Sequence, residues 1–317
     1  MKNNEHIFII GAGAIGKVLA TFLQLEGKNV TLLRGSKPDQ AAYTEKVTIE
    51  LKDGTVVNAL LNISGINNYD SLDGMVVLTT KSYANMSIAK ALQPKMGNSS
   101  LVILQNGLNV ELPFIQHGFT RIYRCVLFAT SQVLSPAYIR FKPVKPSPIG
   151  IIKGNKGTLL SVVRQMHTDF FEFRSEENIQ PIIWSKAIIN SVFNSVCTLL
   201  ETDNGIFHRN NKAQAVAKQL TAGCIAVARA NGVVLDEEKI GEDLLMISRF
   251  SDGQMISTLQ DIRQKRKTEI DSLNFAICDL AEELHMSDLV PGTRLLGELI
   301  ALKSELSMAG STQGEAL

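Results

Sequence analysis

The stretch that decides the fold is HIFIIGAGAIG, residues 6–16, in which an apolar run leads directly into a glycine-rich turn. The continuous apolar residues of His6–Ile10 predict a buried strand. After the turn, Ala14–Leu25 predicts a helix and Asn29–Leu33 predicts a second buried strand. A strand, a tight turn, a helix and another strand form a βαβ unit, which indicates a parallel sheet.

The glycines of this turn have the spacing G-x-G-x-x-G, which is weak evidence alone and stronger between a strand and a helix. Gly11 permits the tight turn, Gly13 lets a pyrophosphate approach the backbone, and Gly16 lets the helix pack against the strand. The helix N-terminus adds unpaired N–H groups and the positive end of the helix dipole. The sequence therefore predicts a dinucleotide site that is formed by Gly11, Ala12, Gly13, Ala14, Ile15 and Gly16.

The end of the second strand indicates which dinucleotide binds. NAD-binding domains place an acidic residue there, which accepts a hydrogen bond from the ribose 2′-hydroxyl. This chain has Arg34 at that position, followed by Ser36 and Lys37. A guanidinium can bind a 2′-phosphate through two hydrogen bonds, and Lys37 adds a second cation. We therefore predict NADPH as the cofactor, with a solvated basic turn as the alternative.

The remaining periodicity divides the chain into two parts. Buried strands are predicted at Met75–Thr79 and Leu101–Leu104, and Lys52-Asp53-Gly54 predicts a hairpin turn. Prolines concentrated between Ser135 and Gly150 exclude a helix there and predict an extended edge or loop.

Helical patterns prevail in the second half, including a long helix at Ala213–Asn231, and the last ten residues have no pattern and are expected to fray. We predict an α/β Rossmann-type domain at residues 1–178 and an all-α domain at residues 179–317.

The composition excludes several classes of partner. The 317 residues carry a net charge of +1, so there is no large basic field for nucleic acid or an anionic membrane. The four cysteines are widely spaced and form no C-x-x-C pair, which is typical of reduced thiols in the cytosol, and no His/Cys cluster suggests a metal. The first residues contain no signal-peptide core. We expect a soluble, cytoplasmic protein with a small-molecule ligand.

One apolar stretch, residues 182–200, is long enough to be considered as a membrane span. It contains Lys186, Asn190 and Asn194, which would be costly in hydrocarbon, so a buried helix of a soluble domain is the better interpretation. The three polar residues recur every four positions and share one face of that helix. Because buried polar groups need partners, the stripe predicts a functional site or, alternatively, a hydrogen-bond network between domains.

Two further polar segments follow predicted strands. Lys81 comes after the strand at Met75–Thr79, and Asn106 comes after the strand at Leu101–Leu104. In open α/β sheets, ligands bind beyond the carboxyl ends of the strands. We therefore expect Lys81 and Asn106 to lie beside the cofactor.

Taken in order, these motifs resemble those of the ketopantoate reductase (2-dehydropantoate 2-reductase) family. That family has an N-terminal G-x-G-x-x-G, a lysine after a strand, an L-Q-N-G turn, a K-x3-N-x3-N helix, and an S-x-L-Q-D segment followed by T-E-I-D. The corresponding segments of this chain are Gly11–Gly16, Lys81, Leu104–Gly107, Lys186–Asn194 and Ser257–Asp271. The resemblance covers nearly the whole chain.

The resemblance implies an NADPH-dependent enzyme that reduces ketopantoate to pantoate for pantothenate and coenzyme A biosynthesis. It implies that Lys186 is the catalytic general acid and that Glu269 is the acidic residue of the site. A cation suits this reaction because hydride addition leaves negative charge on the carbonyl oxygen. The other implied residues are Asn190, Asn194, Ser257 and Asn106 for the substrate, and Lys81 and Asn106 for the cofactor.

One region departs from the family pattern and leaves the substrate open. Ser135–Pro143 lacks the glycine and histidine of the usual hairpin, whereas Ile149-Gly150 is retained. Reduction of another branched 2-oxo acid is therefore the first alternative, and a non-catalytic NADP-binding sensor is the second. The sequence does not distinguish a monomer from a homodimer.

A third alternative is a sugar-phosphate dehydrogenase, since the all-α domain is expected to resemble the C-terminal domain of 6-phosphogluconate dehydrogenase. That activity needs a basic cluster for a substrate phosphate, and the candidates are Arg263, Lys265, Arg266 and Lys267. A solvated helix face is the simpler interpretation of this run.

Overall fold

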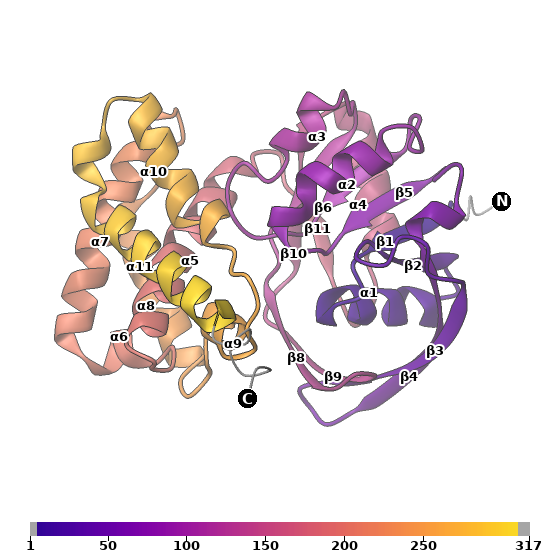
Figure 1. Cartoon of the computed structure of the whole chain (residues 1–317), viewed down its shortest axis with the longest axis horizontal. Helices are drawn as coiled ribbons and strands as arrows, with labels where there is room; N and C mark the ends of the chain where they lie inside the picture. Colours follow the sequence, from indigo (N-terminus) through magenta and orange to yellow (C-terminus); the bar gives the residue numbers. More distant parts are fainter. Residues whose placement is uncertain (1–4, 310–317) are drawn as a thin grey trace. The chain divides into compact units, whose positions relative to one another are not determined.

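The computed structural model describes residues 5–309, which divide into two compact units (Figure 1). The first unit ends at Ile179 and the second begins at Gln180, while the short segment Asn106–Asn109 groups with the second unit. The first unit contains all the strands, and the described part of the second unit contains only helices as regular elements. The predicted fold class, a Rossmann-type α/β domain followed by an all-α domain, is confirmed.

The first unit is built on one mixed sheet with the strand order β11-β10-β7-β6-β5-β1-β2-β4-β3-β9-β8. Six consecutive strands of this sheet are parallel, and in chain order they have the 3-2-1-4-5-6 arrangement of a dinucleotide-binding fold. They are β4 (Val56–Gly65), β2 (Val30–Arg34), β1 (Ile7–Ile10), β5 (Met75–Leu78), β6 (Ser100–Ile103) and β7 (Ile122–Cys125).

Additional strands extend this sheet at both ends. The predicted hairpin pairs β3 (Tyr43–Glu50) with β4, and its turn closes with the Gly54 N–H donating to Leu51 O at 3.1 Å. The proline-rich region, residues 135–150, is extended as predicted, but its strands do not form an edge of the sheet. β9 (Tyr138–Pro143) lies between β3 and β8 (Ala129–Ser135), and β10 (Ser147–Lys153) lies between β7 and β11 (Phe173–Ser175). The sheet ends in β8 on one side and in β11 on the other.

Helices cover both faces of the sheet because alternate residues of each central strand point to opposite sides. Ile7 and Ile9 of β1 belong to a core that includes α1 (Ala14–Leu25) and α4 (Leu159–Met166). Phe8 and Ile10 belong to a second core, on the side of α2 (Asn85–Leu92) and α3 (Leu112–Gln116). The carboxyl ends of the strands thus emerge from a sheet that is buried on both faces.

The second unit is organised around α5 (Gln180–Leu199), which packs against α7, α8, α9 and α11. In the part of the chain that the structure describes, α5 is the one helix that is long and apolar enough to cross a membrane, and 72% of its apolar window is buried. It is therefore a core helix, as predicted. The other helices are α6 (Ile206–Arg209), α7 (Asn211–Ala230), α8 (Glu237–Phe250), α9 (Ser257–Arg263), α10 (Asn274–Glu283) and α11 (Pro291–Ala309).

Two predictions about the second unit are corrected. Helix α9 ends at Arg263, so the basic residues that follow lie in a loop and do not form a helix face. Helix α11 continues through Ala309, because neither glycine nor proline occurs between Gly297 and residue 310. The fraying predicted for residues 308 and 309 was therefore wrong, and residues 310–317 lie outside the described part.

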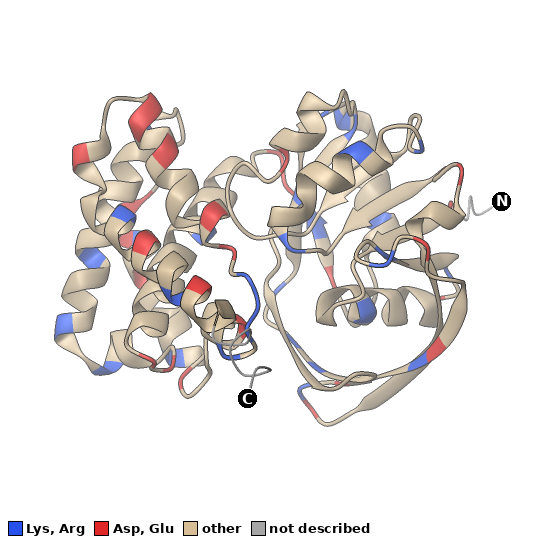
Figure 2. Cartoon of the chain, viewed as in Figure 1, with Lys and Arg blue, Asp and Glu red and all other residues tan. Residues whose placement is uncertain are grey.

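Charge is distributed without a dominant sign. Figure 2 shows Lys and Arg interspersed with Asp and Glu over both units, which agrees with the net charge of +1. The four cysteines are all buried, and none of them forms a disulfide. Burial raises the pKa of Cys197 and Cys278 to about 12 and that of Cys224 to about 11, so these thiols stay protonated at neutral pH.

Candidate active site

The glycine-rich turn between β1 and α1 leaves space for a ligand at the helix N-terminus. Gly11 has a φ of +121°, and a Cβ there would lie 2.7 Å from Thr79 Oγ1. A Cβ on Gly16 would lie 1.9 Å from Gly11 O, whereas a Cβ on Gly13 would meet nothing within 4 Å. The turn thus fits the pyrophosphate of a dinucleotide, because it is closely packed at two glycines and open at the third. The remaining predicted residues of the turn are half-buried: Ala12, Ala14 and Ile15.

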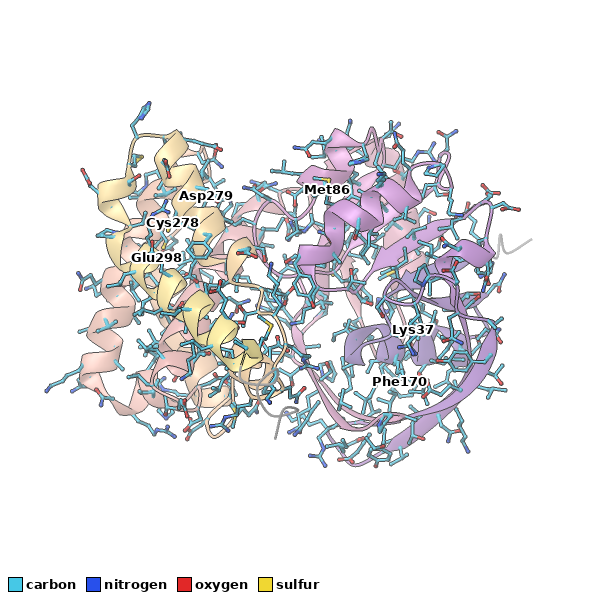
Figure 3. All side chains as sticks on the ribbon, in the orientation of Figure 1. Lys37, Met86, Phe170, Cys278, Asp279 and Glu298 are labelled. Atoms are coloured by element: carbon cyan, nitrogen blue, oxygen red, sulfur yellow. The ribbon has the colours of Figure 1, made fainter. Side chains whose placement is uncertain are left out.

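The cations predicted to select the cofactor lie at the end of β2. Arg34 is the last residue of the strand and is half-buried, and Lys37, labelled in Figure 3, is exposed in the turn that follows. Neither side chain forms an ion pair with any residue that the structure describes. Both positive charges are therefore available to a bound anion.

The end of β5 is tied to the glycine-rich turn. The Thr79 hydroxyl donates to Gly11 O at 2.9 Å, so the two strand-end turns are fixed to each other. Lys81 follows two residues later, half-buried, as the N-cap of a 3-10 helix at Ser82–Ala84. The first unit thus brings Lys81 to the same edge of the sheet as the glycine-rich turn.

The polar stripe on α5 runs from the surface into the core of the second unit. Lys186 and Asn190 are half-buried, whereas Asn194 is only 4% exposed. The Oδ1 atom of Asn194 is buried and accepts no hydrogen bond from the residues that the structure describes. A buried amide oxygen of this kind calls for a water molecule or a ligand as its donor.

The loop that carries Asn106 lies beside the segment that carries Glu269. The Leu108 N–H donates to Ser272 O at 2.8 Å, and the Ser272 hydroxyl donates to Glu269 O at 3.1 Å. Gly107 has a φ of +100°, and a Cβ there would lie 2.4 Å from Ser272 O. A glycine is therefore required for this close approach, which joins two segments that are far apart in the sequence.

The last predicted substrate residue, Ser257, is exposed at the start of α9, and α9 packs against the α5 helix that carries the polar stripe. Glu269 is half-buried and directly precedes a 3-10 helix at Ile270–Ser272.

Most of the basic residues in the run Arg263–Lys267 form ion pairs with acidic residues. The ion pairs are Arg263–Glu201 at 4.0 Å, Arg266–Asp261 at 2.7 Å and Lys267–Asp271 at 3.1 Å. Each of these three cations has a carboxylate nearby, which reduces the positive potential that the run offers to a substrate phosphate. This arrangement weakens the alternative of a sugar-phosphate dehydrogenase.

A buried polar cluster that the sequence did not predict lies at the two ends of the Asn106 loop. It consists of Asn85, Gln105, Glu111 and Arg124, all 9% exposed or less. Arg124 lies in β7, whose sequence IYRC is otherwise apolar or aromatic, and its side chain forms an ion pair with Glu111. A charged residue within such a run was the available signal, since a buried arginine needs a specific partner.

A Rossmann sheet with an open glycine-rich turn, followed by a helical unit with a lysine–asparagine stripe, is the architecture of a dinucleotide-dependent oxidoreductase. Comparison with protein families agrees. The model described as "Ketopantoate reductase PanE/ApbA" matches residues 7–152, and that of its C-terminal domain matches residues 178–304. The chain belongs to the ketopantoate reductase family, whose members use a nicotinamide cofactor, and it is an oxidoreductase.

Individual relatives match over nearly their full length. A 2-dehydropantoate 2-reductase from Pyrococcus abyssi is 29% identical over 304 residues, which cover 95% of this chain and 98% of the relative. The enzyme of the same name from Pyrococcus horikoshii is 26% identical over 303 residues, with the same coverage of both chains.

Solved structures show the same fold. A PanE/ApbA family ketopantoate reductase from Ralstonia eutropha has a TM-score of 0.81 at 21% identity, covering 95% of this chain and 99% of that one. A D-mandelate dehydrogenase in complex with NADH and anilino(oxo)acetate has a TM-score of 0.80 at 20% identity, with the same coverage.

Proposed function

We propose that this chain uses NADPH to reduce 2-dehydropantoate (ketopantoate) to pantoate, a step of pantothenate and coenzyme A biosynthesis, in the cytoplasm. The observation that carries the proposal is the Lys186–Asn194 stripe on α5, which presents a cation and amides along a core helix of a ketopantoate reductase family member. The Pyrococcus relatives, aligned over nearly the whole chain, support the choice of substrate through their names.

The preference for NADPH rests on the end of β2. Arg34 takes the position of the acid that would bind the ribose 2′-hydroxyl of NADH, and no carboxylate among the described residues neutralises it. Arg34 and Lys37 would bind the 2′-phosphate, the turn Gly11–Gly16 would bind the pyrophosphate, and Lys81 and Asn106 would contact the nicotinamide end. The domains that carry these roles are residues 1–178 for the cofactor and residues 179–317 for the substrate and the catalytic groups.

The chemistry assigned to this chain's residues is charge stabilisation and proton transfer. When bound, the cofactor supplies the hydride that adds to the C2 carbonyl carbon of the substrate. The Lys186 ammonium would stabilise the negative charge that develops on the carbonyl oxygen and then donate a proton to it. Glu269 would orient that ammonium or a substrate hydroxyl. The neutral donors that hold the substrate carboxylate and hydroxyl would be Asn190, Asn194, Ser257 and Asn106.

The test is to follow the loss of NADPH absorbance with ketopantoate and, in parallel, with a panel of other 2-oxo acids. We expect ketopantoate to have the highest kcat/KM of the panel and NADPH to be preferred over NADH. Turnover of a different acid alone would retain the mechanism and reject the substrate. Binding of NADPH without turnover of any acid would reject the enzymatic function in favour of a sensor.

Sedimentation of the same sample distinguishes a monomer from a homodimer, and we expect a homodimer like the dimeric ketopantoate reductase from Staphylococcus aureus.

Reduction of another 2-oxo acid is the second candidate. It is favoured by Ser135–Pro143, which forms the turn and the second strand of the β8–β9 hairpin and lacks the usual glycine and histidine of the family. The panel should therefore include branched aliphatic acids and the 2-oxo acid that corresponds to mandelate, because a mandelate dehydrogenase shares the fold.

A further inference from the structure

The loop Asn106–Asn109 is closed at its base by two buried side chains, and each of them contacts both ends of the loop. The first is Asn85, which is 1% exposed at the start of α2. Its Nδ2 donates to Gln105 Oε1 at 2.8 Å on one side of the loop and to Val110 O at 2.7 Å on the other. The Gln105 amide donates back to Asn85 Oδ1 at 2.7 Å, so the two amides form a reciprocal pair.

The second side chain is Arg124, which is 2% exposed in β7. Its Nη2 donates to the backbone oxygen of Gln105 at 3.3 Å, and its Nη1 donates to the carboxylate of Glu111. Gln105 precedes the loop and Glu111 follows it. Arg124, like Asn85, therefore connects the two ends of the loop by hydrogen bonds from one side chain. Asn85 and Arg124 together form a loop clasp.

Gln105, which both residues of the loop clasp contact, is also bonded to the neighbouring strand end. Gln105 Nε2 donates to the Thr80 hydroxyl at 3.1 Å, and Thr80 directly precedes Lys81. The turns after β5 and β6 are therefore joined by one buried hydrogen-bond system. A displacement of either turn would break these hydrogen bonds, most of which are buried.

Stability alone is a poor explanation for the loop clasp. A buried arginine–glutamate pair is often no more stabilising than apolar residues of similar volume, because both charges lose their hydration. Such a pair does, however, fix geometry, because the planar guanidinium directs its donors along set directions. Arg124 directs one donor at the backbone oxygen of Gln105, before the four-residue loop, and another at the Glu111 carboxylate, after it.

We propose that Asn85 and Arg124 are positioning residues for Asn106: by holding Gln105 to Val110 and Glu111, the loop clasp presents the Asn106 amide in one orientation. The inference rests on the proposed function, which assigns Asn106 to the cofactor and the substrate. Groups held in the productive geometry before binding contribute to rate, because their ordering has already been completed.

Asn85→Asp tests the proposal, because it keeps the shape of the side chain and replaces the donor Nδ2 by an acceptor. Asn62→Asp, the same change at an exposed position of β4, is the matched control. In the full-length chain we expect Asn85→Asp to accelerate hydrogen exchange of the amides of residues 106–110. We also expect it to lower kcat/KM by about tenfold, a size typical of the coupling between residues in one hydrogen-bond network. The same substitution in an Asn106→Ala background should lower kcat/KM by less than about twofold, because the residue that Asn85 positions is then absent.

Equal fold-losses in both backgrounds would overturn the proposal, since a merely structural role lowers activity whether or not Asn106 is present. Unchanged exchange of the loop would overturn it as well. Arg124→Lys is the second variant if Asn85→Asp does not fold, because lysine keeps the charge without the two-sided fork. A wild-type chain that binds NADPH but reduces no 2-oxo acid would reject the proposed function, and the same pair of backgrounds would then be compared through the dissociation constant of NADPH.

Discussion

Arg34 shows how much one position at the end of a strand determines. It closes β2 where a NAD-binding domain carries an acid, and its charge is not paired within the described residues. We expect Arg34→Glu to weaken NADPH binding by about 1.5–3 kcal/mol, the value of a lost charged hydrogen bond, and to leave NADH binding nearly unchanged. Titration of both cofactors checks this, with Arg229→Glu on the exposed end of α7 as the control. An unaltered ratio of the two affinities would contradict the assignment to the 2′-phosphate.

Lys186 is the position at which chemistry and stability separate most clearly. Lys186 is half-buried on a mostly apolar helix. Its proposed role as general acid comes into play only after the cofactor has bound. Lys186→Ala should lower kcat by about a hundredfold or more, the usual scale for general acid catalysis, and leave NADPH affinity intact. Stopped-flow turnover and cofactor titration measure the two effects, and Lys218→Ala on exposed α7 is the control. A parallel loss of turnover and cofactor affinity would instead identify Lys186 as a structural residue.

At the scale of elements, the connection after α5 depends on a carboxylate. Asp203 accepts hydrogen bonds from Arg209 at 2.7 Å and from the backbone N–H groups of Gly205 and Gly253, so it joins α6 to the turn before α9. These contacts lower the pKa of Asp203 from 3.8 to about 2. The hydrogen bond from Arg209 has the largest effect, and the two backbone N–H groups add to it.

A lowered pKa in the folded state gives a stabilisation that is complete above the ordinary value of 3.8 and is lost as the pH falls towards about 2. We therefore expect Asp203→Asn to destabilise the chain at neutral pH and to flatten the fall in stability across this acid range. Urea denaturation at a series of pH values measures both effects. Asp288→Asn, in the 3-10 helix before α11, is the control. A variant with the slope of the wild-type chain would show that Asp203 does not contribute to acid unfolding.

The elements that sequence predicted are those with a local signal. The β1–turn–α1 unit, the hairpin at Asp53-Gly54 and the core helix α5 each follow from periodicity or turn chemistry within a few residues. The extension of the sheet does not, because Thr48 of β3 pairs with Tyr138 of β9, ninety positions away. Pairing over that distance depends on the fold as a whole and leaves no periodic pattern.

The candidate site shows the same division. Arg34, Lys81 and the α5 stripe were predicted because each follows a strand end or repeats at helical spacing. The buried pair of Arg124 and Glu111 was not predicted. The two residues lie thirteen positions apart, one in β7 and the other just before α3, and no sequence spacing identifies such a pair. The approach of Gly107 to Ser272 was likewise invisible in the sequence, where the two residues lie in separate motifs.

At the scale of the whole molecule, the chain has separate cores in its two units, and the proposed 2′-phosphate and pyrophosphate contacts all belong to the first. A ligand stabilises the structure that binds it, by about 2.7 kcal/mol at a hundred times its dissociation constant. We therefore expect calorimetry to resolve two transitions, one of which shifts upwards by roughly 5–10 °C with NADPH while the other stays in place. The Arg34→Glu variant at the same NADPH concentration is the control, and NADPH should raise its transition temperature much less. A single transition that shifts as a whole would show that the two units unfold together. The cofactor would then stabilise the helical unit as much as the unit that contains the sheet.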